Sequence, residues 1–422
     1  MNPRIHPTLA GGLFLLGLLF VLAGPAQAAS ARSEPAHAVI LVSLDGVHPD
    51  YLGRGNSPVL DALAAAGSRA RYMRPAYPTL TFPNHYTLVT GLHPDRHGII
   101  DNTMSDPELG GFWLSNREAV GDGRWWSDGE PVWVTAHHRG LRTATMFWPG
   151  SEAPIQGIQP DHWFPYDGGK TKADRVDQVL AWLDLPDGQR PHFMTLYFEQ
   201  VDSVGHARGP GQPEVDAALR RVDAALGRLV EGLRERGQFD RVNLVITSDH
   251  GMAATHPDRV VFVDELIPPG SASIVSIGST LGLNAREGRR AELEAALLGR
   301  HERFACWRRG ELPGRWHFGH HPRVPDIHCQ ADTHWRFVSR ERAARRPGGW
   351  LGGFNLGSHG YDNADPTMRA IFIAHGPDIA AGQLLPPFDG VHVHALLLDL
   401  LDIEGPADVD SDPAVLAPAR VR

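Results

Sequence analysis

A nearly continuous apolar run, Ala38–Leu44, constrains the fold of this chain more than any other feature of its sequence. Such runs are typical of strands that are buried on both faces in a parallel sheet. Further segments with the composition of strands are 143–148, 192–198, 242–247, 260–263 and 369–375. Helical patterns alternate with them at 58–66, 172–183, 214–236, 289–300 and 392–401. This alternation predicts an α/β fold with a doubly wound, mostly parallel sheet flanked by helices.

The region before the last strand segment departs from this pattern. Residues 265–357 are less regular and rich in Gly, Pro and His. We expect them to form a smaller subdomain inserted into a main domain of residues 36–405, with residues 406–422 as a C-terminal tail. A chain of 422 residues is long enough to bury the core of such a domain.

The N-terminus has the composition of an export signal. Arg4 precedes an apolar run from Leu9 to Leu22, and Ala26-Gln-Ala28 follows before polar sequence begins. This order predicts a signal peptide of residues 1–28, cleaved after about Ala28. An uncleaved membrane anchor is the alternative. After cleavage we expect no stable membrane anchor and a periplasmic or secreted protein, and the Ala- and Arg-rich composition suggests a bacterial source.

Cysteine content and net charge bear on the environment and partners of the chain. Cys306 and Cys329 could form a disulfide in an oxidising compartment, and two buried free thiols are the alternative. The formal net charge of −9 argues against a surface that coats nucleic acid. An anionic small-molecule substrate would need local positive charge, which bound metal ions could supply.

Acid and histidine side chains follow three of the predicted strands, and one more histidine follows the irregular region. The six candidate metal ligands are Asp45, Asp202, His206, Asp249, His250 and His359. Each of these aspartates, taken alone, could be an ordinary turn or N-cap residue. In doubly wound sheets, however, ligands bind beyond the carboxyl ends of the strands, so these side chains should meet at one edge. Three Asp and three His are enough ligands for two zinc ions.

Thr81 lies in Tyr-Pro-Thr-Leu-Thr-Phe-Pro-Asn-His and precedes an apolar stretch that can form a helix ending at Gly91. Pro83 suits the first turn of such a helix, since it has no N–H to leave unsatisfied. Thr81 would then lie at the helix entrance, where free N–H groups and the dipole favour an anion. A plain N-cap threonine is the alternative. Because zinc lowers the pKa of a bound hydroxyl, Thr81 beside two zinc ions indicates metal-assisted attack at phosphorus or a related centre.

Long segments around these residues resemble the nucleotide pyrophosphatase/phosphodiesterases of the alkaline phosphatase superfamily. The strongest likeness covers residues 77–102, from Tyr77-Pro-Thr-Leu-Thr to Ile-Ile-Asp-Asn102. Shorter matches are Pro131-Val-Trp-Val-Thr, Trp148-Pro-Gly-Ser, the Asp202/His206 segment, Ser248-Asp-His-Gly-Met and Gly357-Ser-His-Gly-Tyr-Asp-Asn. The resemblance covers about residues 36–405 and implies an alkaline-phosphatase-like fold, with a phosphodiesterase catalytic domain in that range.

The resemblance also implies a role for each candidate residue. One zinc would be held by Asp202, His206 and His359, and the other by Asp45, Asp249, His250 and the Thr81 hydroxyl. Thr81 would attack phosphorus in line and form a covalent nucleotidyl-threonine, from which water releases a nucleoside 5′-monophosphate. Asn102 would donate its amide hydrogens to a non-bridging phosphate oxygen, and this neutral donor suits the single charge of a diester.

The substrate side is less sharply defined. Positions that contact the base in nucleotide-cleaving members are matched by Phe82, Leu114, Tyr166 and Tyr197, although core aromatics would look the same. Stacking on aromatic faces gives little selectivity among bases. The chain departs from its relatives at two places. It has Arg117-Glu118 where they tend to carry a lysine, and Glu152 where an Asp is expected. Both departures leave the contacts to the phosphate tail and the ribose open.

Three functions compete on this sequence. The first is an exported two-zinc hydrolase that cleaves nucleotide pyrophosphate or phosphodiester bonds. The alternative within the superfamily is a phosphodiesterase of choline lipids or glycerophosphodiesters, which needs a cage for the trimethylammonium group. Trp113, Trp125, Trp126 and Glu152 could contribute to one. The third is a non-catalytic binding module, against which the complete ligand set and Thr81 both argue.

Overall fold

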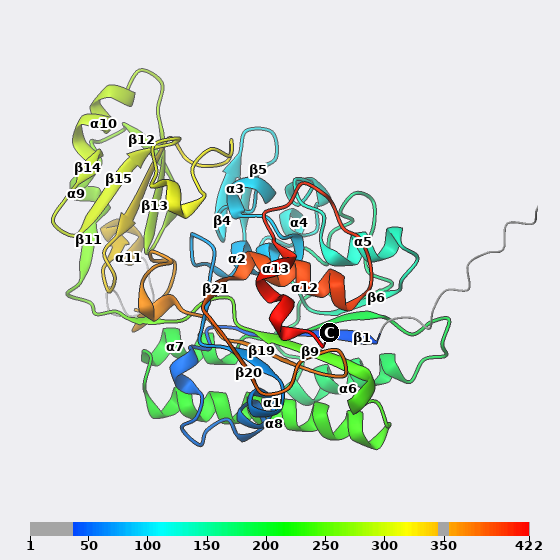
Figure 1. Cartoon of the computed structure of the whole chain (residues 1–422). Coiled ribbons are helices and arrows are strands. Elements are labelled where there is room, and N and C mark those ends of the chain that lie inside the picture. The colour runs from blue at the N-terminus through cyan, green and yellow to red at the C-terminus, as the bar shows by residue number, and fades with distance from the viewer. Residues whose placement is uncertain (1–36, 345–353, 422) are drawn as a thin grey trace, which may run out of the picture. The chain divides into compact units, whose positions relative to one another are not determined.

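The computed structural model describes residues 37–344 and 354–421 of the chain (Figure 1). The expected signal peptide, residues 1–28, lies outside these residues. Within the described ranges, no helix combines the length and the apolar character that a membrane span requires.

An eight-stranded sheet carries the fold. Its strands, in spatial order, are β20 (Gln383–Leu385), β2 (Ser68–Ala70), β19 (Phe372–His375), β9 (Val242–Thr247), β1 (Ala38–Leu44), β8 (Phe193–Phe198), β6 (Thr143–Met146) and β7 (His162–Trp163). β19 runs antiparallel to both its neighbours, and the other neighbouring strands pair in parallel. The fold is therefore α/β with a mostly parallel sheet, as the sequence predicts.

Helices cover both faces of this sheet, which explains why β1 is apolar almost throughout (Figure 1). Val39 and Leu41 belong to a core cluster with residues of α2 (Thr81–Thr90) and α12 (Val393–Leu400). Ile40, Val42 and Leu44 point the other way, because successive side chains alternate along a strand. They belong to a cluster with residues of α1 (Pro58–Ala66), α6 (Lys172–Leu183) and α8 (Pro213–Glu235). Full burial of one such side chain stabilises the fold by about 1.5–3 kcal/mol.

A second, separate sheet lies between β11 and β18 in the sequence. Its strands, in spatial order, are β12 (Ala272–Ile277), β13 (Thr280–Ala285), β16 (Ile327–Ala331), β15 (Phe304–Arg308) and β14 (Gly299–Arg300). All its neighbouring strands are antiparallel, and α10 (Arg290–Leu297) packs into the same core cluster. Cys306 and Cys329 stand opposite each other on β15 and β16 and form a disulfide, with their Cα atoms 4.0 Å apart.

Shorter elements complete the described part of the chain. The two-stranded pairs are β3 (Met73–Arg74) with β21 (Phe388–Asp389), β4 (Thr103–Asp106) with β5 (Gly110–Trp113), β10 (Ala253–Ala254) with β18 (Gly357–Ser358), and β11 (Val260–Phe262) with β17 (Arg336–Val338). The shorter α-helices are α3 (Pro94–His97), α4 (Arg117–Val120), α5 (Val132–His138), α7 (Gln200–Arg208), α9 (Val263–Leu266), α11 (Arg340–Ala344) and α13 (Pro413–Leu416). The segment predicted as a strand at 260–263 thus lies outside the large sheet.

The residues expected to be a C-terminal tail return to the core. Leu416 and Ala419 are buried in the same cluster as α2 and α12. The Asp410 carboxylate accepts a hydrogen bond from the backbone N–H of His93, just after α2. The chain end therefore helps to support α2.

Candidate active site

Three adjacent strands end at one edge of the large sheet and bring the candidate ligands together. β1 lies between β8 and β9 in parallel register. Asp45 follows β1 directly, and its backbone accepts a hydrogen bond from the Asp202 N–H at 3.1 Å. The Gly46 N–H donates to Asp249 Oδ1 at 3.2 Å. The acidic residues that follow three strands therefore converge, as ligands do at the carboxyl ends of a parallel sheet.

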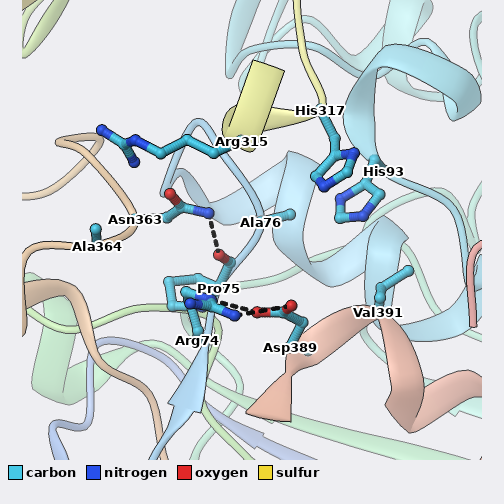
Figure 2. Close-up of a pocket in the computed structure, with 11 residues that line it drawn as sticks. Arg74, Pro75, Ala76, His93, Arg315, His317, Asn363, Ala364, Asp389 and Val391 are labelled. Carbon is cyan, nitrogen blue, oxygen red and sulfur yellow. Dashed lines mark hydrogen bonds and ion pairs between the residues drawn. The ribbon is translucent and has the colours of Figure 1, made fainter. Parts of the chain in front are cut away.

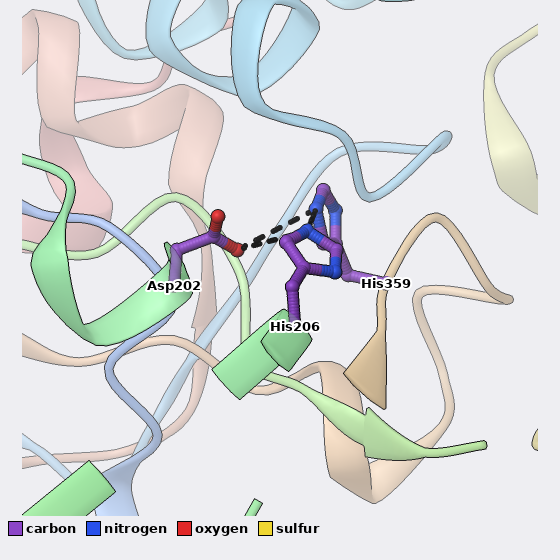
Figure 3. Close-up of side chains that lie close together, drawn as sticks. All are labelled: Asp202, His206 and His359. Atoms are coloured by element: carbon purple, nitrogen blue, oxygen red, sulfur yellow. Dashed lines mark hydrogen bonds and ion pairs between the residues drawn. The ribbon is translucent and has the colours of Figure 1, made fainter. Parts of the chain in front are cut away.

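Asp202, His206 and His359 form the first ligand group (Figure 3). Asp202 and His206 lie one turn apart on α7, so their side chains project from the same face of the helix. His359 follows β18 and points at both of them. The His206 Nε2 and His359 Nε2 atoms lie 3.4 and 3.6 Å from Asp202 Oδ1, and 3.1 Å from each other.

The spacing of these three atoms matches a zinc site. A tetrahedral zinc ion with ligand bonds of about 2.0–2.1 Å separates its ligand atoms by about 3.3 Å. The three observed separations lie close to this value on either side. Three protein ligands also leave one position open, as catalytic zinc sites do.

Asp45, Asp249, His250 and Thr81 form the second group. His250 Nε2 is 3.0 Å from Asp249 Oδ2, 3.6 Å from Asp45 Oδ1 and 3.3 Å from Thr81 Oγ1. A ligand atom of Asp202 also lies within 4.8 Å of those of Asp45 and His250. Asp202 therefore lies between the two groups, which places them side by side.

The ring of each ligand histidine is oriented by a backbone carbonyl. The Nδ1 atoms of His206, His250 and His359 lie 2.8–2.9 Å from the carbonyl oxygens of Gly357, Gly251 and Thr79 respectively. Since a carbonyl only accepts, each Nδ1 must donate, and the Nε2 lone pair is left for a metal. Burial lowers the pKa of His359 well below its ordinary value, which keeps this ring neutral and able to coordinate.

The charges at this edge call for bound cations. Asp45 Oδ1, Asp202 Oδ1 and Asp249 Oδ2 are buried without a hydrogen-bond partner among the described residues. The ion-pair partners of these three carboxylates in the described part of the chain are all histidines. Burial, together with the charges of Asp249 and Asp202, raises the pKa of Asp45 well above its ordinary value, and burial raises that of Asp202. Divalent cations would satisfy these oxygens and offset their charge, so the residues present fit a metal site.

Thr81 is the first helical residue of α2, with its hydroxyl directed at the second group. Leu80 is the N-cap residue and makes no side-chain cap, so Thr81 does not serve as the plain N-cap that was the alternative. Thr81 O accepts a hydrogen bond from His85 Nδ1 at 2.8 Å, which fixes the first turn. The Thr81 hydroxyl, 3.3 Å from His250 Nε2, is in position to join the ligand set.

Asn102 is oriented by the same helix start. Its Oδ1 accepts a hydrogen bond from the Phe82 N–H at 2.9 Å, so its NH2 group remains available to donate. This contact uses the Phe82 N–H, and Pro83 has no N–H. The first turn of α2 therefore offers an anion fewer backbone donors than a free helix N-terminus, while the Asn102 NH2 group is available as a further donor.

Thr79 is a site residue that sequence reasoning missed. Its hydroxyl donates to Tyr361 O at 2.9 Å and accepts from the Gly360 N–H at 2.9 Å, while its carbonyl accepts from His359 Nδ1. The loop before Thr81 and the loop that carries His359 are thereby tied together, although about 280 residues separate them. No periodic or local signal indicates such a contact; only the position of Thr79 inside the long matching segment points to it.

The predicted substrate residues lie in different surroundings. The half-buried Phe82 ring packs beside Phe112 and Trp126, with both centroids 5.9 Å away, and Leu114 is 44% exposed. The Tyr166 ring packs edge-on against Phe147 at 5.2 Å. Phe82 and Tyr166 are thus partly buried and Leu114 is exposed.

Tyr197 differs from the other three because it is buried and its hydroxyl donates to Asp45 Oδ2 at 2.6 Å. Its described polar contact is thus with a candidate metal ligand. Burial and the neighbouring Asp45 charge raise the pKa of Tyr197 well above its ordinary value, so the hydroxyl stays protonated and can donate. Tyr197 therefore orients the Asp45 carboxylate through its Oδ2 atom, the one other than Oδ1.

Residues 39–362 match the family described as type I phosphodiesterase/nucleotide pyrophosphatase. The chain belongs to this family. It is 35% identical over 384 residues to an uncharacterised pyrophosphatase/phosphodiesterase of Schizosaccharomyces pombe, covering 86% of this chain and 77% of the relative. It is 39% identical over 380 residues to ectonucleotide pyrophosphatase/phosphodiesterase family member 3 of Bos taurus, covering 87% of this chain. The chain spans only 42% of the bovine protein's length.

Solved structures of this hydrolase family have the same fold. Human ectonucleotide pyrophosphatase/phosphodiesterase 5 superimposes with a TM-score of 0.85 at 29% identity, covering 91% of this chain and 99% of that one. The murine protein, described as an inactive threonine-to-alanine variant in complex with AMP, also gives a TM-score of 0.85, at 30% identity over 91% of this chain and 100% of that one. These relatives are eukaryotic, so the bacterial source suggested by composition stays a prediction.

The hydrogen bond from Tyr197 to the candidate metal ligand Asp45 can be tested by mutation. Replacing Tyr197 with Phe is expected to weaken metal binding at the Asp45 group by about tenfold, because outer hydrogen bonds orient a ligand carboxylate and tune its basicity. Titration with a competing chelator measures this change. Tyr86→Phe is the matched control, since its buried hydroxyl donates to the Trp126 and Gly129 carbonyls instead. Equal metal affinity in both variants would show that Tyr197 does not orient Asp45.

A cavity of about 240 Å³ lies behind the loop that leads to Thr81 (Figure 2). Arg74 pairs with Asp389 at its floor, and Asn363 Nδ2 donates to Pro75 O at 3.2 Å. Its lining contains no predicted site residue. These contacts hold residues 74 and 75 of the loop that leads to Thr81.

Proposed function

We propose that the protein is an exported two-zinc phosphodiesterase that cleaves nucleotide pyrophosphate or phosphodiester bonds and releases nucleoside 5′-monophosphates. The observation that carries this proposal is the placement of the Thr81 hydroxyl beside His250, which belongs to one of two neighbouring groups of candidate metal ligands. The signal of residues 1–28 would direct the enzyme to the periplasm or outside the cell.

The residues of the chain would divide the reaction among them. The Thr81 oxygen attacks phosphorus in line, forming a Thr81–phosphorus bond as the bond to the leaving oxygen breaks. The Asn102 NH2 group donates to a non-bridging oxygen, whose charge grows in the transition state. Water then attacks the same phosphorus, breaks the Thr81 bond and releases the nucleotide. Two bound zinc ions would lower the pKa of the Thr81 hydroxyl and offset charge on the attacking and leaving oxygens.

A nucleotide substrate is favoured over a choline ester by the surroundings of the aromatic residues. Of the aromatic residues considered for a choline cage, Trp125 and Trp126 are fully buried and cannot take part, which leaves Trp113, 48% exposed, as the one aromatic candidate. Glu152 already pairs with Arg117. Phe82 and Tyr166, in contrast, are only partly buried, and a base could stack on such aromatic residues. The murine relative described with AMP, and as inactive after a threonine-to-alanine change, supports both the substrate class and the role of Thr81.

Three chromogenic esters test the proposal. We expect the zinc-loaded protein to cleave p-nitrophenyl thymidine 5′-monophosphate at least about 100-fold more efficiently than p-nitrophenyl phosphate or p-nitrophenyl phosphorylcholine, a difference of about 2.7 kcal/mol in transition-state binding. A preference for the choline ester would keep the metal chemistry but overturn the substrate. A preference for the monoester would contradict the role given to Asn102.

A further inference from the structure

We propose that Arg117 and Glu152 act together as a positioning pair, which holds Tyr166 in place and thereby sets the affinity for the nucleoside part of the substrate. This inference rests on the proposed nucleotide substrate and extends it to two residues without an assigned role. They also lie where the resemblance to the family leads us to expect other residues, a lysine near Arg117 and an aspartate at the place of Glu152.

The contacts of the pair converge on the backbone of Tyr166. Glu152 Oε1 accepts a hydrogen bond from the Tyr166 N–H at 2.8 Å. Arg117 Nη2 donates to the Tyr166 carbonyl oxygen, while its Nη1 donates to Glu152 Oε2 at 3.2 Å. One ion pair therefore satisfies both backbone polar groups of Tyr166. Charge-assisted hydrogen bonds of this kind are stronger and more directional than neutral ones.

The pair also connects segments that are far apart in the sequence. Arg117 begins α4 three residues after Leu114, and Glu152 lies in the turn after Trp148-Pro-Gly-Ser. The Glu152 carbonyl accepts from Gln159 Nε2 at 2.9 Å, which holds its turn. Tyr166 follows β7. The ion pair thus links the segment that carries Leu114 to the loop that carries Tyr166, and so fixes the spacing between two candidate base contacts.

Because the ion pair is partly exposed to solvent, it can position Tyr166 without contributing much to the stability of the fold. The Arg117 side chain is 57% exposed and that of Glu152 is 14% exposed. Ion pairs with an exposed member contribute little to global stability. Losing the Arg117 guanidinium should therefore release the Tyr166 loop without unfolding the domain. Since the pair touches neither Thr81 nor the ligand groups, the chemical step should be spared.

Steady-state kinetics on two diesters test this inference. In Arg117→Ala we expect KM for p-nitrophenyl thymidine 5′-monophosphate to rise about tenfold while kcat changes less than about twofold, the signature of lost uniform binding. Efficiency on methyl p-nitrophenyl phosphate, which has no nucleoside, should not change. Glu152→Gln keeps an acceptor for the Tyr166 N–H but loses the charge, so its effect should be smaller. Arg124→Ala is the control, because that exposed arginine pairs with Asp122.

The outcomes distinguish this inference from the proposed function. Equal losses on both diesters, or an unchanged KM for the thymidine ester, would overturn the positioning role. A wild-type protein that cleaves neither diester would contradict the proposed function instead. Binding of AMP, measured by calorimetry, would then test whether Arg117 and Glu152 position Tyr166. About tenfold weaker binding to Arg117→Ala than to Arg124→Ala would support it, and equal binding would refute it.

Discussion

Replacing Thr81 with alanine is expected to lower kcat on a nucleotide ester by at least about 10³-fold while the metal content stays unchanged. The Thr81 hydroxyl contacts the second ligand group through His250, and that group keeps Asp45, Asp249 and His250 without it. Turnover and zinc content, measured on the same preparation, check both parts of this expectation.

Two variants control for changes unrelated to the hydroxyl at the helix start. Thr81→Ser keeps an oxygen at the same place and should retain activity within about tenfold of wild type. Thr90→Ala removes a hydroxyl from the other end of α2, where it donates to Tyr86 O, and should leave kcat unchanged. A metal-loaded Thr81→Ala protein with near wild-type turnover would show that another group attacks phosphorus.

Removing His359 is expected to take away about one zinc ion per chain and to lower kcat by at least about 10³-fold. Its Nε2 belongs to the first ligand group alone, together with Asp202 and His206. Asp202 belongs to the first group and also has a ligand atom within 4.8 Å of those of Asp45 and His250, so Asp202→Ala should lose more zinc than His359→Ala. A larger zinc loss in Asp202→Ala than in His359→Ala is expected only if Asp202 lies between the two ligand groups, as it does in the structure.

Elemental analysis after gel filtration measures the zinc content of each variant. His93→Ala is a suitable control, because His93 stacks on His317 at 4.5 Å and contacts neither ligand group. It should bind as much zinc as the wild type. Two zinc ions retained in His359→Ala would mean that His359 is not a ligand.

The convergence of the candidate ligands could be anticipated because the apolar strand segments and the residues that follow them are local signals. Asp45 and Asp249 each follow a run of buried apolar residues, and such runs form the inner strands of a parallel sheet. The structure pairs these two strands directly, with Ser43 opposite Thr247. Once the strands are neighbours, the residues that follow them must meet at the same edge.

The remaining contacts could not be anticipated because they depend on side chains far apart in the sequence. The Tyr197 hydroxyl reaches Asp45 across 152 positions, and Arg117 reaches Glu152 across 35. Neither pair has a periodicity or a spacing that marks it. For the 260–263 segment the strand itself could be predicted, but its partner could not. That partner, β17, lies about 75 residues later and outside the large sheet.

The configuration at phosphorus after cleavage is the most direct measurement of the attack by Thr81. A thymidine 5′-phosphorothioate ester of one configuration would be hydrolysed by the zinc-loaded protein in ¹⁸O-labelled water, and the product configuration determined. Attack by Thr81 followed by attack by water makes two in-line displacements, each of which inverts phosphorus. Overall retention is therefore expected. Overall inversion would mean that water attacks the substrate directly and that Thr81 forms no covalent intermediate.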